Sequence, residues 1–225
     1  MKNEFSIKGI KGKQFSAVIF DMDGVLVDSE PFYTSVERDN FEKLGLNISM
    51  KEHKTYQGTA TDLMWKKLTE KYNLTQTVEQ LVEMTNSMVT PYFQSLKAIE
   101  TMPGVRELIK DLCHKKIPLA VASSSYADVI EIILQKTGLK KYFSTIVNSQ
   151  MVGSSKPKPD IFLLAAKNLG VSLEKCLVIE DSTNGIKAAK RAGMFCIAFA
   201  GPGSEHQDQS EADLIVKSFD EIVSF

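Results

Sequence analysis

The chain has 225 residues, of which 43% are hydrophobic and 24% are charged, and its formal net charge is −1 at pH 7. This length can bury the core of one domain or of two modest ones, and the composition is ordinary for a globular protein. The chain has no excess of positive charge that would attract a nucleic acid or a membrane surface, so we expect neither as a partner.

The sequence shows neither a signal peptide nor a long apolar stretch, and we expect a cytoplasmic protein, either a monomer or a weak homodimer. Its three cysteines, Cys113, Cys176 and Cys196, are far apart and form no C-x-x-C pair. Reduced thiols are therefore expected. At the start of the chain, residues 1–14 are polar and rich in lysine, which predicts a loose arm or a short edge element.

A buried strand is predicted over residues 17–20, where a short apolar run stops abruptly at Asp21. Asp23 follows two residues later, and Gly24 comes directly after it. Because residues i and i+2 of an extended segment point the same way, the two carboxylates can face one spot. Carboxylates this close repel each other unless a metal lies between them or one holds a proton, so the segment predicts a reactive site.

Residues 31–100 are rich in helix formers and contain no convincing strand. Helical periodicity is visible over 32–44, 62–72 and 78–96, and the chain returns to an α/β pattern near Met102. Loop tips beside a site tolerate insertions. We therefore predict an inserted helical cap domain over residues 30–100 and a catalytic core made of residues 1–29 and 101–225.

Strand-like runs and helical patterns alternate in the rest of the chain. This alternation favours βαβ units, and hence an α/β fold with a doubly wound, mainly parallel, Rossmann-like sheet. Ligands of such sheets bind beyond the carboxyl ends of the strands. The predicted strands cover 117–122, 145–148, 176–180, 195–200 and 213–216, and the predicted helices cover 104–115, 127–137, 159–169 and 184–192.

Four chemical features lie at or near predicted strand ends: the Asp21 and Asp23 pair, Ser123, Lys156, and the pair Glu180-Asp181. Each alone has an ordinary explanation, such as a helix N-cap for the serine or a surface charge for the lysine. In a parallel sheet, however, they converge on one edge. Carboxylates, a hydroxyl and an ammonium group together suit Mg²⁺ and a phosphate group.

In sequence order, these motifs resemble those of the haloacid dehalogenase superfamily, in its branch of phosphatases and phosphomutases with a helical cap. The matching residues are Asp21-Met22-Asp23-Gly24-Val25, Ser123, Lys156 and Glu180-Asp181, and the segment from Asn184 to Ala189 resembles the helix that follows the last motif. The resemblance covers roughly residues 16–202.

The resemblance implies a role for each matching residue. Asp21 would be the nucleophile that forms an aspartyl-phosphate, and Asp23 would be the general acid and base. Ser123, Ser124 and Lys156 would bind the phosphoryl group. Dehalogenases of this fold lack an acid/base aspartate at the Asp23 position, so its presence favours phosphate-ester chemistry.

The resemblance also implies Mg²⁺ as the cofactor. Asp21 and Asp181 would bind the ion directly, Glu180 directly or through water, and Asp23 through its backbone carbonyl. A binding or regulatory module that kept the fold without the activity is a weaker alternative, because every catalytic position is filled.

The cap is expected to select the substrate. Ser29 and Glu30 are predicted to line the entrance, and helix capping at these residues can hold at the same time. Gly58 lies in a loop that resembles the family's substrate-specificity loop, and this role is favoured over an ordinary turn. β-Phosphoglucomutases carry a histidine where Tyr33 stands here and an arginine where Thr61 stands. These departures favour a phosphatase of a small phosphorylated metabolite, with a sugar phosphate as the expected substrate and a phosphomutase as the alternative.

Overall fold

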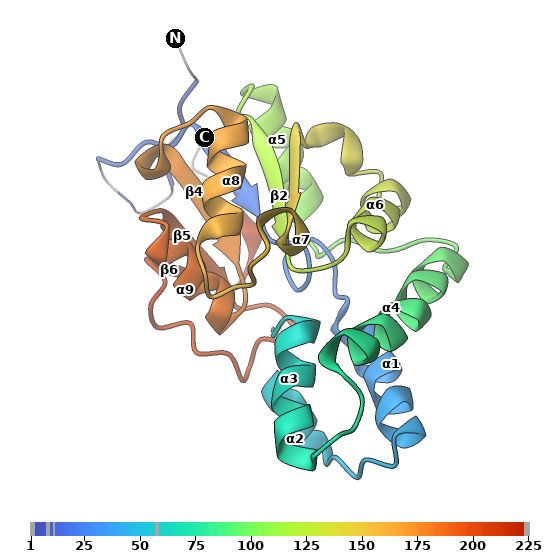
Figure 1. Cartoon of the computed structure of the whole chain (residues 1–225). Coiled ribbons are helices and arrows are strands. Elements are labelled where there is room, and N and C mark those ends of the chain that lie inside the picture. The colour runs from blue at the N-terminus through green and yellow to red at the C-terminus, as the bar shows by residue number, and fades with distance from the viewer. Residues whose placement is uncertain (1–2, 8–9, 11, 57–58, 223–225) are drawn as a thin grey trace.

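A parallel β-sheet forms the centre of the molecule. The computed structural model describes residues 3–7, 10, 12–56 and 59–222. Within these ranges the strands are β1 (Ala17–Phe20), β2 (Leu119–Ser123), β3 (Thr145–Asn148), β4 (Cys176–Glu180), β5 (Phe195–Phe199) and β6 (Leu214–Val216). All their pairings are parallel, and the strand order is β3-β2-β1-β4-β5-β6. The predicted doubly wound α/β class is thus confirmed (Figure 1).

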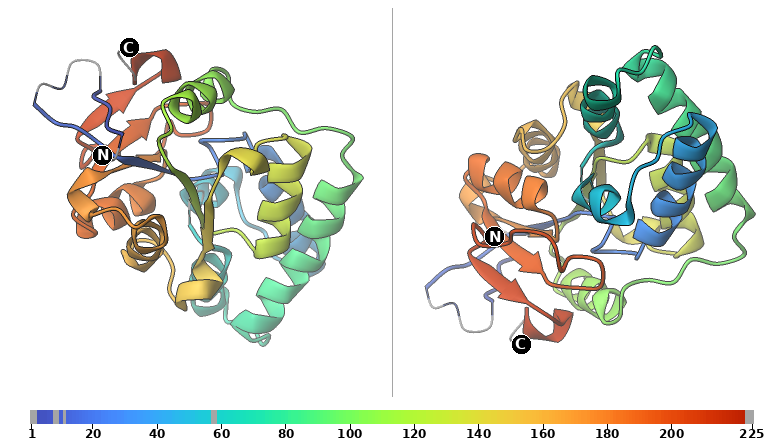
Figure 2. Two further views of the ribbon diagram at one scale, coloured as in Figure 1. Left: turned by 90° about the horizontal axis from the view of Figure 1, so that it is seen from above. Right: turned by 90° about the horizontal axis from the view of Figure 1, so that it is seen from below.

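Helices cover both faces of this sheet (Figure 2). They are α5 (Val105–His114), α6 (Ala127–Lys136), α7 (Ser149–Val152), α8 (Asp160–Leu169) and α9 (Thr183–Arg191). Side chains alternate along a strand, so Val18 and Phe20 of β1 belong to the apolar cluster that includes α5 and α6 residues. Ala17 and Ile19 belong to the opposite cluster, which includes residues of α8 and α9. Both faces of the central strand are buried, as its unbroken apolar run predicts.

Strand bounds differ from the prediction by one or two residues. β2 begins at Leu119 rather than at 117, because the Ile117 amide donates to Leu112 O and thereby belongs to the end of α5. β5 ends at Phe199 rather than at 200, and β6 begins at Leu214 rather than at 213. None of these shifts moves a strand end away from the predicted site.

A helical layer stands to one side of the sheet, at the end where β1 finishes (Figure 1). It contains α1 (Glu30–Lys43), α2 (Met50–His53), α3 (Thr61–Tyr72) and α4 (Val78–Ser95). Phe41, Trp65 and Leu68 belong to a separate buried cluster within this layer, which gives it a core of its own. Trp65 is fully buried and is therefore part of this core. The one-turn helices α2 and α7 were not predicted, because four residues show no periodicity.

The layer is joined to the sheet by two linkers that lie side by side. The amide of Met102, in the returning linker, donates to Leu26 O in the outgoing one at 2.9 Å. Thr90 of α4 also donates from its hydroxyl to the Asp128 carboxylate of α6 at 2.8 Å. The division into an inserted unit and a core stays a prediction, and α1 begins at the first residue proposed for the insert.

The amino-terminal segment folds back on the residues that precede β1. Phe5 and Phe15 pair as an isolated antiparallel bridge, and both side chains are buried. Within the described ranges, the helices are too short or too polar to cross a lipid bilayer.

Candidate active site

The ends of three neighbouring strands bring the predicted polar residues together. Asp21 follows β1, Ser123 ends β2, and Glu180 ends β4, and all three side chains are buried. The Asp21 amide donates to Ile179 O at 2.9 Å, which extends the β1–β4 ladder to Asp21. The strand order therefore explains why residues so distant in sequence meet at one point.

Lys156 enters this cluster from the loop before α8 and is only 6% exposed. Its Nζ donates to Asp21 Oδ1 at 2.6 Å, to Glu180 Oε1 at 2.7 Å and to Ala122 O at 3.1 Å. Burial alone would lower the pKa of this ammonium group, but the Asp21 and Glu180 carboxylates raise it above its ordinary value. Lys156 is thus a fixed cation between two carboxylates.

The electrostatics of Asp21 reflect the same crowding. Burial raises the pKa of its carboxyl to about 8, Lys156 acts against this shift, and the Glu180 and Asp23 carboxylates add to it. Burial also holds the pKa of Asp181 well above its usual range, and Glu180 and Asp21 reinforce the effect. A group of carboxylates this costly to ionise together favours a bound cation.

Three carboxylates are close enough to hold a metal ion. Asp21, Glu180 and Asp181 each offer an oxygen, and these oxygens lie within 4.8 Å of one another. Hard, buried carboxylate oxygens fit Mg²⁺. Gly24 has a φ of +81°, and a Cβ there would lie 2.2 Å from Asp181 Oδ2, so the absence of a side chain lets the first loop close over the cluster.

Both carboxylate oxygens of Glu180 accept hydrogen bonds from the protein. Its Oε1 accepts from Lys156, and its Oε2 accepts from the amides of Asp181 and Ser182, both at 2.9 Å, and from the Ser182 hydroxyl at 3.0 Å. A Cβ at Gly185 would lie 1.7 Å from Glu180 Oε1, so α9 also packs directly against this carboxylate. This carboxylate therefore anchors Lys156 and the loop after β4.

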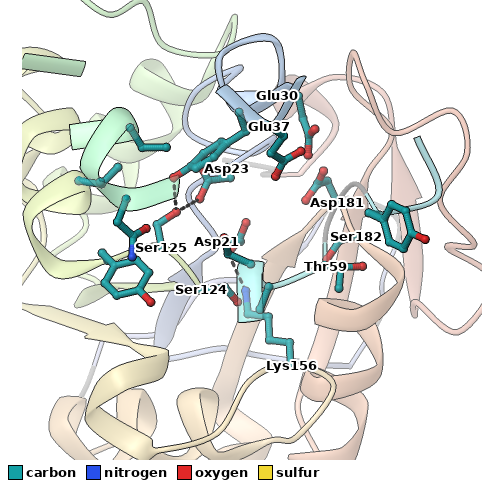
Figure 3. A pocket seen from close by; sticks show the side chains of 18 residues that line it. Asp21, Asp23, Glu30, Glu37, Thr59, Ser124, Ser125, Lys156, Asp181 and Ser182 are labelled. Atoms are coloured by element: carbon teal, nitrogen blue, oxygen red, sulfur yellow. Dashed lines mark hydrogen bonds and ion pairs between the residues drawn. The ribbon is translucent and has the colours of Figure 1, made fainter. Parts of the chain in front are cut away.

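Asp23 lies outside the three-carboxylate cluster and binds hydroxyl groups instead. Its Oδ1 accepts from Ser29 at 2.5 Å, and its Oδ2 accepts from Ser125 at 2.7 Å and from Ser123 at 3.2 Å. Ser29 occupies the N-cap position of α1, but its side chain makes no cap hydrogen bond. Tyr33 OH lies 2.8 Å from Ser125 Oγ, so the helical layer reaches Asp23 through that serine (Figure 3).

A cavity opens between these strand ends and the helical layer (Figure 3). Of the predicted site residues, Asp21, Asp23, Ser124, Lys156 and Asp181 line it on the side of the sheet. The predicted Glu30 also lines it, whereas Gly58 lies outside the described residues. Lining residues that the sequence analysis did not single out for a role here include Ser125, Glu37, Asn86, Val89 and Ser182.

The family model for haloacid dehalogenase-like hydrolases matches residues 18–199. A probable pseudouridine-5'-phosphatase of Drosophila melanogaster is 31% identical over 209 residues, which cover 89% of this chain and 88% of the relative. A phosphorylated carbohydrates phosphatase of Thermotoga maritima is 35% identical over 178 residues, covering 79% and 82% of the two chains.

The fold has a close match among solved structures. A β-phosphoglucomutase from Clostridium difficile superposes with a TM-score of 0.80 at 26% identity, and the match covers 91% of each chain. The similarity thus extends over both the sheet and the helical layer.

Proposed function

This chain is a phosphatase of the haloacid dehalogenase-like hydrolase family, and we propose that it hydrolyses the phosphomonoester of a small metabolite, foremost a sugar phosphate, through an aspartyl-phosphate at Asp21. The main observation in support of this proposal is the position of Asp21. Its carboxylate lies on the cavity wall, within 2.6 Å of the buried Lys156 ammonium and within the cluster formed with Glu180 and Asp181.

Asp21 attacks phosphorus in the proposed reaction. A bond forms between an Asp21 carboxylate oxygen and phosphorus while the ester bond to the leaving oxygen breaks. Asp23 gives a proton to that leaving oxygen and later takes one from the water that cleaves the aspartyl-phosphate. Lys156 and Ser123 position the phosphoryl group, and such positioning and charge neutralisation supply most of the catalysis in phosphoryl transfer.

We further propose that Asp21 and Asp181 hold Mg²⁺, with the Asp23 carbonyl as another ligand and Glu180 as a direct or water-mediated one. When bound, the ion neutralises charge on the phosphoryl oxygens. Asp181 is free of the Lys156 contacts that occupy Asp21 and Glu180, which supports it as a direct ligand.

The two relatives, a probable pseudouridine-5'-phosphatase and a phosphorylated carbohydrates phosphatase, support a phosphorylated sugar or nucleoside as the substrate. A phosphomutase remains the second candidate because of the structural match to β-phosphoglucomutase. Tyr33 and Thr61 line the cavity, and neither side chain carries the positive charge that would bind the second phosphate of a bisphosphate. This observation favours hydrolysis over mutase chemistry.

The direct test measures phosphate release from p-nitrophenyl phosphate with Mg²⁺. Release should stop with EDTA and return with added Mg²⁺. Asp21→Asn should abolish it, whereas Asp28→Asn, an exposed change in the same loop, should not. A phosphate adduct on the peptide that contains Asp21 should accumulate in Asp23→Ala. Activity that survives Asp21→Asn would overturn the proposal.

A second assay separates the two candidate reactions. The protein is incubated with β-glucose 1-phosphate and a bisphosphate primer, and both free phosphate and glucose 6-phosphate are measured. We expect phosphate release to dominate. Efficient conversion to glucose 6-phosphate would favour the mutase.

A further inference from the structure

One face of α1 supplies a stripe of polar residues to the cavity. Glu30, Tyr33 and Glu37 all line it, and spacings of three and four residues place them on the same side of a helix. In Figure 3 the carboxylates of Glu30 and Glu37 lie across the cavity from Lys156, with Asp21 between them. Asn86 of α4 lines the same cavity. The wall beyond the reacting phosphoryl group is therefore rich in hydrogen-bond acceptors.

Glu37 is held in place by a buried histidine. His53 Nε2 lies 2.5 Å from Glu37 Oε2, and the side chains are 2% and 14% exposed, respectively. The Phe41 ring packs edge-on against the imidazole, with ring centroids 4.9 Å apart, so the histidine itself is fixed. The pair uses one oxygen of Glu37, and a carboxylate has a second oxygen that accepts hydrogen bonds.

This wall offers no cation to a second anionic group. Lys156 is the one lysine or arginine among the described residues that line the cavity, and it is already paired with Asp21 and Glu180. Lys54, which follows His53, lines a separate hollow. A second phosphate or a carboxylate on the substrate would face Glu30 and Glu37, and like charges in a partly buried site repel strongly. Hydroxyl groups would instead donate to these carboxylates.

We propose that Glu37, anchored by His53, is a specificity-determining residue that accepts hydrogen bonds from the hydroxyls of an uncharged, polyol-like leaving group. The same carboxylate rejects substrates that carry a second phosphate or a carboxylate. This inference rests on the phosphatase function proposed above and narrows its substrate class.

The test compares kcat/KM for a hexose 6-phosphate, the matching hexose 1,6-bisphosphate, phosphoglycolate and p-nitrophenyl phosphate, whose leaving group has no further hydroxyl. In the unaltered protein, kcat/KM for the hexose 6-phosphate should exceed kcat/KM for the bisphosphate and for phosphoglycolate by about tenfold or more. In Glu37→Gln the ratio of hexose 6-phosphate to p-nitrophenyl phosphate should fall about tenfold, because a charged acceptor is replaced by a neutral one. In the same variant, the ratio of kcat/KM for the hexose 6-phosphate to kcat/KM for the bisphosphate should decrease.

Two further variants separate recognition from packing. Glu42→Gln makes the same change on an exposed position of α1 and should leave every ratio unchanged. His53→Gln should shift the hexose-to-nitrophenyl ratio in the same direction as Glu37→Gln but less far. A purely structural pair would instead lower both activities equally.

The outcomes are distinct. A bisphosphate or phosphoglycolate preferred over the hexose 6-phosphate, or ratios that do not respond to Glu37→Gln, would overturn this inference while leaving the phosphatase intact. A protein with no Asp21-dependent hydrolysis of p-nitrophenyl phosphate would overturn the function itself, and this inference with it.

Discussion

The sheet side and the helix side of the cavity hold their polar side chains in different ways. On the sheet side, Lys156 and Glu180 are buried and each makes several hydrogen bonds from different segments. On the helix side, Tyr33 and Glu37 are half-buried, and the hydrogen bonds described above tie each to a single side chain. The side with many hydrogen bonds suits phosphoryl chemistry, which is the same for every ester, and the helix side, whose residues are each held by one hydrogen bond, suits selection of the leaving group.

Removing Lys156 should give the largest effect. Lys156→Met leaves the Asp21 and Glu180 carboxylates buried without their cation, which should destabilise the protein by about 3–5 kcal/mol. Hydrolysis of p-nitrophenyl phosphate should fall by about 10³-fold, because the phosphoryl group loses a fixed positive charge. Urea unfolding and steady-state kinetics measure the two losses.

The exposed Lys158 provides the matched control for this change. Lys158→Met should alter neither quantity measurably. A Lys156→Met protein of normal stability would contradict a sheet side whose buried carboxylates depend on Lys156.

The core of the helical layer should unfold separately when it is weakened. Phe41 is 1% exposed and packs edge-on against Trp65 with ring centroids 5.7 Å apart, so Phe41→Ala should cost about 3–5 kcal/mol. Trp65 is the one tryptophan of the chain, so its fluorescence reports on this layer. In Phe41→Ala the fluorescence midpoint in urea should fall below the midpoint from far-ultraviolet circular dichroism.

Phe162→Ala offers the opposite comparison, since that ring is buried against the sheet. It should lower the circular dichroism midpoint at least as much as the fluorescence midpoint. Coincident midpoints in both variants would contradict a helical layer with an independent core.

A methyl group at Gly24 should disturb the carboxylate cluster directly. Gly24→Ala would place Cβ 2.2 Å from Asp181 Oδ2 at a φ of +81°, and misplacing a site carboxylate should cost about 100-fold in kcat/KM. Gly45→Ala adds similar backbone strain at a φ of +67° but meets nothing within 4 Å. Kinetics of the two variants should therefore differ, and equal activity would argue against a close fit of the loop around Asp181.

The smallest effect is expected at Ser125, which links the helical layer to Asp23. Ser125→Ala removes a hydrogen bond of 2.7 Å to Asp23, worth about 1 kcal/mol or a fivefold loss in kcat/KM. The loss should be larger for an alkyl phosphate than for p-nitrophenyl phosphate, because only the poor leaving group depends on protonation. Equal losses on the two substrates would show that Ser125 does not act through Asp23.

The sheet side of the site could be predicted from the sequence because its residues directly follow or end strands that are visible as apolar runs. Apolar runs mark the strands, and parallel pairing brings Asp21, Ser123 and Glu180 to one edge. The length of the Lys156 side chain then suffices to reach both carboxylates from its loop.

The helix side could not be predicted in the same way. For Ser29 the sequence allowed both helix capping and a place at the entrance; its hydroxyl makes no cap hydrogen bond and instead binds Asp23, a choice that only the fold of the loop decides. His53 drew no functional expectation, because it belongs to a one-turn helix without periodicity and meets Glu37 only through packing between helices. The three- and four-residue spacing from Glu30 through Tyr33 to Glu37 was the available signal.

The hydrogen bond between Leu26 and Met102 has a consequence for protein engineering. These residues are 76 positions apart in the sequence (102 − 26), yet their backbones are joined at 2.9 Å. A turn of a few residues could therefore replace everything between them without stretching β1 or β2. A minimal sheet built this way would also need polar substitutions on the sheet-side partners of Val36, Val89 and Phe93, whose removal would expose an apolar patch. The same junction should accept helical inserts from other proteins as exchangeable modules.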